Sequence, residues 1–142
     1  MKVVYGEGLY IGYRHYERMK IAPLFPFGHG LSYTTFTYGK PVISSTVLAD
    51  SEKITITVPV TNSGSVEGAE IVQAYIHDEK SRLPRPEKEL QAFAKVFLKP
   101  GETQDAVLSI DKYSVGYYDT DEKEWIAEEG IFNVLIGSSS AD

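Results

Sequence analysis

The sequence predicts an antiparallel all-β sandwich preceded by an irregular N-terminal arm. Three observations support this fold class. Apolar and polar residues alternate from about residue 42 onward, turn-forming residues separate the alternating stretches, and no window of a dozen residues shows the 3.6-residue apolar period of a helix. A parallel sheet would need helical crossovers of about ten to fifteen residues, and the sequence has none.

The first clear alternation is the stretch KITITVPVTN at residues 53–62. Its apolar side chains fall on one face and its threonines on the other, which is typical of a half-buried strand. Pro59 cannot donate to a ladder of hydrogen bonds, so we expect an edge position or a bulge there. The following NSGSVEG, residues 62–68, is rich in turn residues.

Four more strands and a hairpin follow, expected at residues 69–78, 89–98, 103–110 and 131–137, with the hairpin tip at 119–123. The strand at 69–78 has apolar side chains on both faces and is therefore expected to be central. In the strand at 89–98, Phe93 and Phe97 point away from the alternating core positions.

The composition excludes several classes of function. The 14 basic and 20 acidic residues give a net charge of −6 without a Lys/Arg cluster, which argues against a nucleic-acid partner. With no cysteine, the chain has no disulfide and no thiolate metal site. The longest uncharged window, residues 21–39, contains prolines and glycines that would leave backbone groups unpaired in lipid, so we expect no membrane span. The N-terminal residues do not have the pattern of a signal peptide.

Histidine and serine give no recognisable catalytic pattern. His15, His29 and His77 lie in different segments and lack the spacing of a metal site. Ser32 lacks the second glycine of a G-x-S-x-G nucleophile elbow.

Paired carboxylates are a second possible source of chemistry. Glu87 and Glu89 lie two residues apart at the start of a strand, which places them on one face, where they could do acid/base work. Arg85 and Lys88 lie beside them and favour a solvated, charged edge instead.

Ten tyrosines are the remaining signal. Tyr113, Tyr117 and Tyr118 lie near one hairpin and could stack on sugar rings. The favoured alternative is that such rings are buried in the sandwich and that their hydroxyls are hydrogen-bonded. Taken by themselves, the residues indicate no catalytic centre, no cofactor site and no metal site.

Several motifs together resemble a known family. EGLYIGYRHYE (7–17) and PLFPFGHGLSYTTF (23–36) are similar to the junction between the second and third domains of family 3 glycoside hydrolases, the β-glucosidase family. VTNSGSVEGAEIVQAYI (60–76), RPEKELQAFAKVFLKPGE (85–102) and FNVLIGSSSAD (132–142) match, in order, the C-terminal fibronectin type III-like domain of that family.

The resemblance implies an immunoglobulin/fibronectin type III-like sandwich at residues 31–142, with LSYTTF (31–36) beginning its first strand. Residues 1–30 would be an arm from the preceding domain. The parent would be a retaining glycoside hydrolase in which a (β/α)8 barrel supplies an Asp nucleophile and an α/β sandwich supplies the acid/base Glu.

Both catalytic carboxylates would lie upstream of this chain, so the chain alone is not expected to be an enzyme and no cofactor is implied. It would be a non-catalytic accessory domain that packs against and stabilises the barrel and the α/β sandwich. A carbohydrate-binding module that uses surface tyrosines is the alternative.

The resemblance also implies which residues contact the preceding domain: Tyr10, Tyr13, Arg14, Tyr16, Phe25, Phe27, His29 and Tyr33. Arg14 is expected to pair with a carboxylate or a backbone carbonyl there, and His29 to be a hydrogen-bonding wedge. In the isolated chain the arm must fold back on the sandwich, become disordered or pair with another copy. Because exposed aromatic patches favour association, we expect the isolated chain to dimerise or to have a mobile arm.

Overall fold

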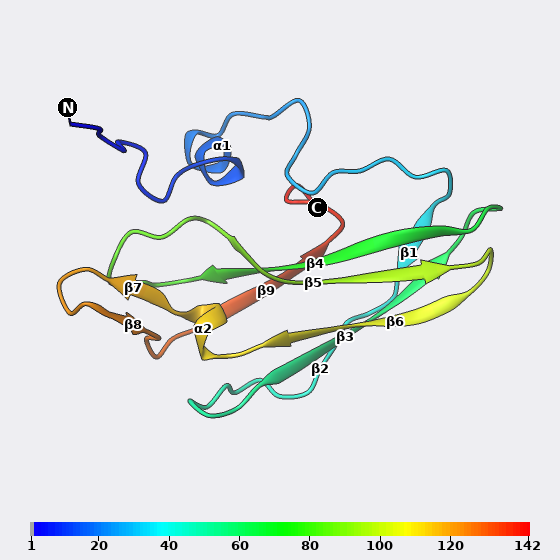
Figure 1. Cartoon of the computed structure of the whole chain (residues 1–142). Coiled ribbons are helices and arrows are strands. Elements are labelled where there is room, and N and C mark those ends of the chain that lie inside the picture. The colour runs from blue at the N-terminus through cyan, green and yellow to red at the C-terminus, as the bar shows by residue number, and fades with distance from the viewer. Residues whose placement is uncertain (1) are drawn as a thin grey trace.

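The computed structural model describes residues 2–142, and in this range the chain forms nine strands and two short helices. In chain order they are α1 (Tyr13–Met19), β1 (Phe36–Tyr38), β2 (Val42–Ile43), β3 (Ile54–Asn62), β4 (Gly68–Asp78), β5 (Glu89–Leu98), β6 (Thr103–Ile110), α2 (Lys112–Val115), β7 (Tyr117–Asp119), β8 (Glu124–Ile126) and β9 (Phe132–Gly137). Figure 1 shows two layers of sheet, with α1 and the arm lying beyond the layer that contains β4, β5 and β9.

All strand pairs are antiparallel, as the sequence predicts. In the four-stranded sheet, β3 pairs with β6 on one side and with β1 and β2 on the other. The three-stranded sheet has the order β5-β4-β9, which confirms the prediction that the strand at 69–78 is central. A separate hairpin joins β7 and β8.

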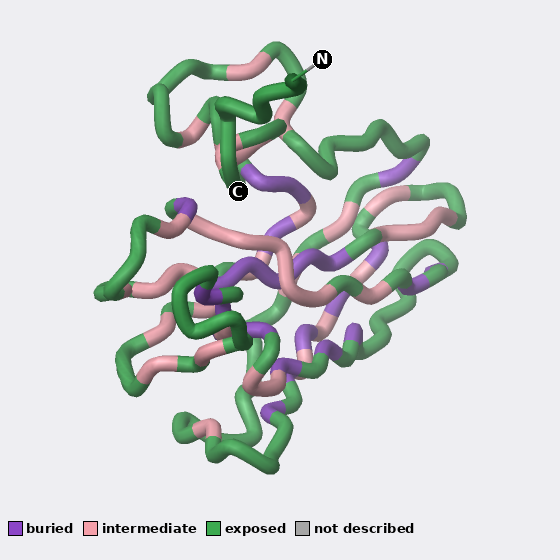
Figure 2. Tube along the Cα trace, turned by 60° about the vertical axis from the view of Figure 1, so that its left-hand side comes forward, coloured by how far each residue is buried: buried purple, intermediate pink, exposed green. Residues whose placement is uncertain are grey.

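The core lies between the two sheets and is formed by the alternating positions. On β3, Ile54, Ile56, Val58 and Val60 are all buried. They meet buried side chains of the other strands, namely Val72, Ala74 and Ile76 of β4, Val96 and Leu98 of β5, and Ala106, Leu108 and Ile110 of β6. Figure 2 shows buried positions alternating with more exposed ones along strands, as on β3 and β6, whereas residues 72–76 of β4 are all buried. The period-two pattern therefore determines which face of each strand is buried.

Pro59 does not lie on an edge strand, so the prediction for that position was wrong. The β3–β6 register runs without interruption from Ile54 to Thr61. On the other side, Pro59 lies between the residues that pair with β1 and those that pair with β2, and its carbonyl oxygen accepts from Gly39 N (2.7 Å). Because N–H and C=O groups of one strand residue point to the same side, the missing N–H faces this gap and costs no ladder bond.

Asn62 connects three segments at one end of the sandwich and is fully buried. Its side-chain amide donates to the carbonyl oxygens of Val66 (2.8 Å) and Leu98 (3.0 Å). Its side-chain oxygen accepts from the Thr34 hydroxyl (2.6 Å) and from Gly64 N (3.1 Å). One buried amide thus fixes the 62–68 turn, the end of β5 and the segment just before β1.

The arm differs from the prediction in two respects. It contains the helix α1, whose seven residues are too few to show a period in a window of a dozen. Glycine at the N-cap makes no side-chain hydrogen bond, so the helix depends on its tertiary contacts. Leu31 to Thr35 are not a strand, and β1 begins only at Phe36.

Candidate docking surface

Tyr13 anchors the arm to the outer face of the three-stranded sheet. Its ring stacks on Phe27 (centroids 5.0 Å apart) and meets the ring of Tyr75 edge-on (5.9 Å). Its hydroxyl oxygen accepts from Leu90 N (2.9 Å) at the start of β5. Since this N–H belongs to the sandwich, the arm contributes to the hydrogen bonding of the sheet it covers.

Charged pairs also join the arm to the sandwich. Arg14 pairs with Glu89 (3.2 Å) and Glu17 pairs with Lys88 (3.3 Å), so two residues of α1 contact the first residues of β5 and the segment before it. Burial raises the pKa of the Glu17 carboxyl above its ordinary value. Oε2 of Glu17 is buried and has no hydrogen-bond partner among residues 2–142.

The FPFGHG segment contacts the sheet through Gly28. Gly28 has φ +80°, and a Cβ there would lie 2.3 Å from Oε1 of Gln73. Gln73 Nε2 donates to the carbonyl oxygens of Ser138 (2.5 Å) and Gly28 (3.4 Å), while Ser140 N donates to the carbonyl oxygen of Phe27 (2.8 Å). Only glycine satisfies both the backbone conformation and the close approach at position 28.

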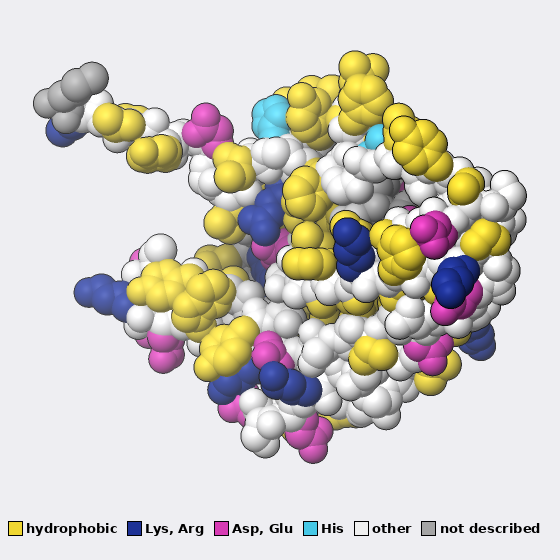
Figure 3. Space-filling model, turned by 45° about the vertical axis from the view of Figure 1, so that its right-hand side comes forward, with side chains coloured by type: hydrophobic (Ala, Val, Ile, Leu, Met, Phe, Trp, Pro, Cys, Tyr) yellow, Lys and Arg dark blue, Asp and Glu magenta, His cyan; other side chains and the backbone are white. Residues whose placement is uncertain are grey.

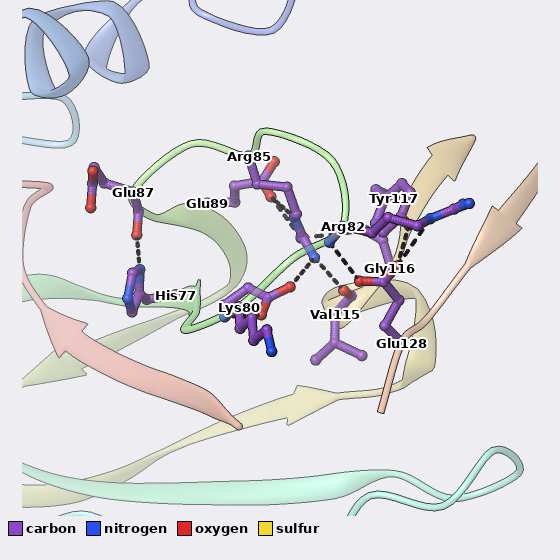
Figure 4. A network of polar contacts seen from close by, with 11 residues as sticks. His77, Lys80, Arg82, Arg85, Glu87, Glu89, Val115, Gly116, Tyr117 and Glu128 are labelled. Atoms are coloured by element: carbon purple, nitrogen blue, oxygen red, sulfur yellow. Dashed lines mark hydrogen bonds and ion pairs between the residues drawn. The ribbon is translucent and has the colours of Figure 1, made fainter. Parts of the chain in front are cut away.

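Arg85 is the centre of a buried polar network that fixes the segment between β4 and β5 (Figure 4). Its side chain is only 6% exposed and pairs with Asp78 (3.3 Å) and Glu89 (2.7 Å). It also donates to the carbonyl oxygens of Val115 (2.7 Å) and Gly116 (3.5 Å) at the end of α2. The solvated edge expected for Glu89 is therefore wrong, because two arginines cover this carboxylate, whereas Glu87 is exposed.

Arg82 makes a second, more exposed connection to the β7–β8 hairpin. It pairs with Asp119 and with Glu128 (3.4 Å). The Tyr117 hydroxyl donates to Glu128 (2.7 Å), which lowers the pKa of that carboxyl. The two arginines together hold the 79–88 segment between the arm and the hairpin.

Exposed apolar side chains surround the point where the arm crosses the sheet. Phe93 is 70% exposed and Phe97 59% exposed, and the register places them opposite Gln73 and Ala69, on the same face that the arm contacts. We call the following set the apolar surface: Ile21, Leu24, Phe25 and Phe27 of the arm, Leu31 and Tyr33 directly after it, and Ile71, Phe93, Phe97 and Leu135 of the sheet. Figure 3 shows hydrophobic side chains gathered on one side of the molecule, with charged side chains between some of them.

A hollow of about 480 Å³ lies within the arm part of this surface. Tyr16, Phe25 and Phe27 line it together with Lys88 and Ser140. Its walls are mostly apolar and its shape is concave, so it could receive an apolar side chain of a neighbouring surface.

The eight residues expected at an interdomain contact divide into two groups. Tyr10, Tyr13 and Arg14 contact the sandwich, Tyr10 through a hydrogen bond from its hydroxyl to the carbonyl oxygen of Arg85 (3.4 Å). The other five are exposed: Tyr16, Phe25, Phe27, His29 and Tyr33. Their contact with a neighbouring domain stays a prediction. His29 stacks on Phe25 (5.8 Å).

The sheet part of the apolar surface was not among the expected site residues. Phe93 and Phe97 belong to it, and the sequence carried a usable signal, since both alternate out of phase with the core positions of β5. A phenylalanine on the solvent face of an antiparallel strand is itself an indication of a covered face.

The tyrosines near the hairpin do not form a common platform. Tyr117 is 8% exposed with its hydroxyl bonded to Glu128, which agrees with the favoured interpretation as a buried residue. Tyr118 is exposed and meets Trp125 at an interplanar angle of 71°, so their faces do not align into a row for sugar rings. Tyr113 is exposed and lies under Lys112 (5.5 Å).

Residues 2–142 contain neither a metal-binding cluster nor a helix that could span a membrane. No group of three or more His, Asp or Glu side chains in this range is placed to hold a metal ion. Neither of the helices in this part of the chain is long and apolar enough to cross a membrane.

Comparison with known proteins gives matches over the whole chain. A family model described as a fibronectin type III-like domain matches residues 70–140. The thermostable β-glucosidase B of Acetivibrio thermocellus is 49% identical over 141 residues, covering 99% of this chain and 19% of that protein. The probable β-glucosidase H of Aspergillus clavatus is 46% identical over 142 residues, covering 99% and 17%.

Solved structures agree with these matches. A β-glucosidase from Streptomyces venezuelae in complex with D-glucose superposes with a TM-score of 0.88 at 37% identity, covering 97% of this chain and 17% of that one. The GH3 β-glucosidase of Bifidobacterium adolescentis gives 0.89 at 37% identity, covering 97% and 20%. The chain therefore spans about a fifth of the length of these proteins.

Proposed function

Because this chain belongs to the fibronectin type III-like domain family, we propose that it is the non-catalytic accessory domain of a β-glucosidase-like, retaining family 3 glycoside hydrolase. Its role is to pack against the catalytic domains and to stabilise them. The matched β-glucosidases, of which the chain covers about a fifth, support a parent enzyme of this kind.

The apolar surface is the observation that carries this proposal. Monomeric soluble proteins rarely expose large contiguous apolar patches, and such patches commonly mark contact surfaces. Burying one exposed phenylalanine gains roughly 1.5–3 kcal/mol, so covering both Phe93 and Phe97 would by itself stabilise an assembly by several kcal/mol.

In this proposal, residues 1–30 are the connection from the preceding α/β domain, and residues 31–142 are the accessory sandwich. The arm residues that contact the sandwich fix the path of the connection. The arm residues that remain exposed face the α/β domain or the (β/α)8 barrel.

A turnover assay tests the non-catalytic role. The isolated chain is expected to release no aglycone from an aryl β-glucoside, since both catalytic carboxylates are assigned to other domains. Turnover that one carboxylate-to-amide substitution in residues 2–142 abolishes would overturn this role.

The packing role is tested by two variants, each made in the isolated chain and in the proposed parent enzyme. The first is Phe93→Ser with Phe97→Ser, and the second is the control Val107→Ser, which is 58% exposed on the opposite outer face. The double serine variant is expected to lower the Tm of the proposed parent enzyme and to leave the Tm of the isolated chain unchanged. The Val107→Ser control is expected to change neither Tm. Equal Tm shifts for the first variant in both settings would contradict the proposal.

A further inference from the structure

The edge of β9 that faces away from β4 is a second candidate contact site, formed by backbone groups and not by the side chains of the apolar surface. β9 pairs with β4 on one side and is the outermost strand of its sheet. Glu79 N donates to the carbonyl oxygen of Ile131 (3.1 Å), and the β4–β9 register continues from this pair. Since hydrogen-bonded pairs alternate in an antiparallel ladder, Asn133, Leu135 and Gly137 direct their backbone groups to β4.

The backbone groups of the intervening residues therefore point away from β4, to the open side. These residues are Phe132, Val134 and Ile136, whose side chains pack against the core. Within residues 2–142, no hydrogen bond from another element reaches their N–H or C=O groups. The edge thus offers three donors and three acceptors at regular spacing.

This edge lacks the usual protection against strand pairing. Natural edge strands are protected by charged side chains, prolines, bulges or short length. FNVLIG has no charged residue and no proline, and its register with β4 contains no bulge. A hollow of about 760 Å³, lined in part by Phe132 and Val134, opens between β9 and the loop after β2, so core side chains are accessible beside the edge.

We propose that this edge is a strand-addition site whose occupant is the β9 strand of a second copy of the chain. The strand is self-complementary: in an antiparallel pair centred on Val134, that residue faces its own counterpart and Phe132 faces Ile136 of the second copy. The three residue pairs each exchange two hydrogen bonds, so every free edge group is satisfied. The arrangement has a two-fold axis and forms a closed dimer.

The arm is a less suitable basis for self-association than this edge. Tyr13 and Arg14 attach the arm to its own sandwich, and Gly28 lies on the face of the three-stranded sheet and not on its edge. The dimer does not depend on the proposed function, because it uses the edge of the sheet and leaves the apolar surface free for other domains.

Sedimentation and amide exchange of the 142-residue chain test the proposal. The chain is expected to dimerise, and the amides of Phe132, Val134 and Ile136 are expected to lose protection on dilution while those of Asn133 and Leu135 do not. A chain that stays monomeric at millimolar concentration, or a dimer whose Phe132, Val134 and Ile136 amides exchange freely, overturns the proposal.

Two variants distinguish a dimer interface at the edge of β9 from one on the apolar surface. Val134→Pro removes the central outward N–H without removing a donor to β4, so the dimer is expected to weaken at least about tenfold, since two hydrogen bonds are lost per dimer. The variant that combines Phe93→Ser and Phe97→Ser alters the apolar surface. It is expected to dimerise as strongly as the unsubstituted chain. If the double serine variant abolishes the dimer, the apolar surface and not the edge is the interface. Exchange in the unsubstituted chain decides the matter if Val134→Pro does not fold.

Discussion

The outer face of the four-stranded sheet carries short hydroxyl side chains, whereas the outer face of the three-stranded sheet carries large apolar ones. On β3 and β6 the outward positions include Thr55, Thr61 and Thr103, and the last two hydroxyls are 2.8 Å apart. On β4 and β5 they include Tyr75 and Phe93. Both sheets share one core, so stability of the sandwich does not require this difference.

The difference also extends to what lies above each face. The arm and the 79–88 segment cover part of the three-stranded sheet and are attached by buried ion pairs, aromatic contacts and a close glycine approach. The threonine face has no comparable cover among residues 2–142. A solvent-adapted face beside a partly covered, apolar face supports the proposal that the second face contacts another domain.

The largest expected effect comes from removing the centre of the covering layer. Arg85→Ala leaves the carboxylates of Asp78 and Glu89 without their main buried partner, and breaking a buried pair in this way costs about 3–5 kcal/mol of unfolding free energy. Urea unfolding measures this loss of unfolding free energy. The control Lys112→Ala breaks an exposed pair with Asp50 (3.6 Å) and should cost no more than about 1 kcal/mol. Equal losses would show that burial of the network is unimportant.

A glycine substitution tests the close approach of the arm. Gly28→Ala is expected to cost about 1–3 kcal/mol, because it strains a backbone with φ +80° and places a Cβ against Gln73. Gly30→Ala, two residues away in open space, is the matched control and should change stability by less than about 0.5 kcal/mol. Thermal unfolding compares the stabilities of the two variants. If Gly28→Ala is as stable as Gly30→Ala, the arm does not contact the sheet in this way.

A smaller effect is expected from a single hydroxyl. Tyr13→Phe keeps the ring contacts but leaves Leu90 N without its acceptor, which costs about 0.5–1.5 kcal/mol and should speed amide exchange at Leu90. Tyr33→Phe alters a side chain that is 98% exposed and is expected to have no effect. An unchanged Leu90 exchange rate in Tyr13→Phe would contradict the contact.

The smallest effect is a pH dependence at Glu17. Because burial raises its pKa above the ordinary 4.5, the folded state takes up this proton at a higher pH than the unfolded state, and the ionised group opposes folding near pH 7. At pH 7 the Glu17→Gln variant is therefore expected to have a free energy of unfolding that exceeds that of the unsubstituted chain by less than about 1 kcal/mol. This advantage is expected to disappear as the pH falls toward 4.5. Unfolding at the two pH values measures it, with the exposed Glu52→Gln as control. An advantage that grows on acidification would contradict the assignment.

The sandwich was predictable from sequence because its strands follow a period of two. Alternation alone identified the buried faces of β3, β4 and β6 and placed Phe93 and Phe97 outside the core. The prediction for Pro59 was wrong because the sequence does not show that two short strands, β1 and β2, pair along the same side of β3. The helix α1 and the pairing of Glu89 with Arg14 depend on contacts between segments far apart in the chain, which no local pattern reports.

Solvent accessibility of the two outer faces, measured by hydroxyl-radical footprinting and mass spectrometry, tests the central claim most directly. The isolated chain and the proposed parent enzyme are compared at Phe25, Phe93, Phe97 and, on the opposite face, Val107. The three phenylalanines are expected to react more slowly in the proposed parent enzyme than in the isolated chain, while Val107 is expected to react equally in both. Equal reactivity of the phenylalanines in the two samples would contradict the assignment of this face as the docking surface.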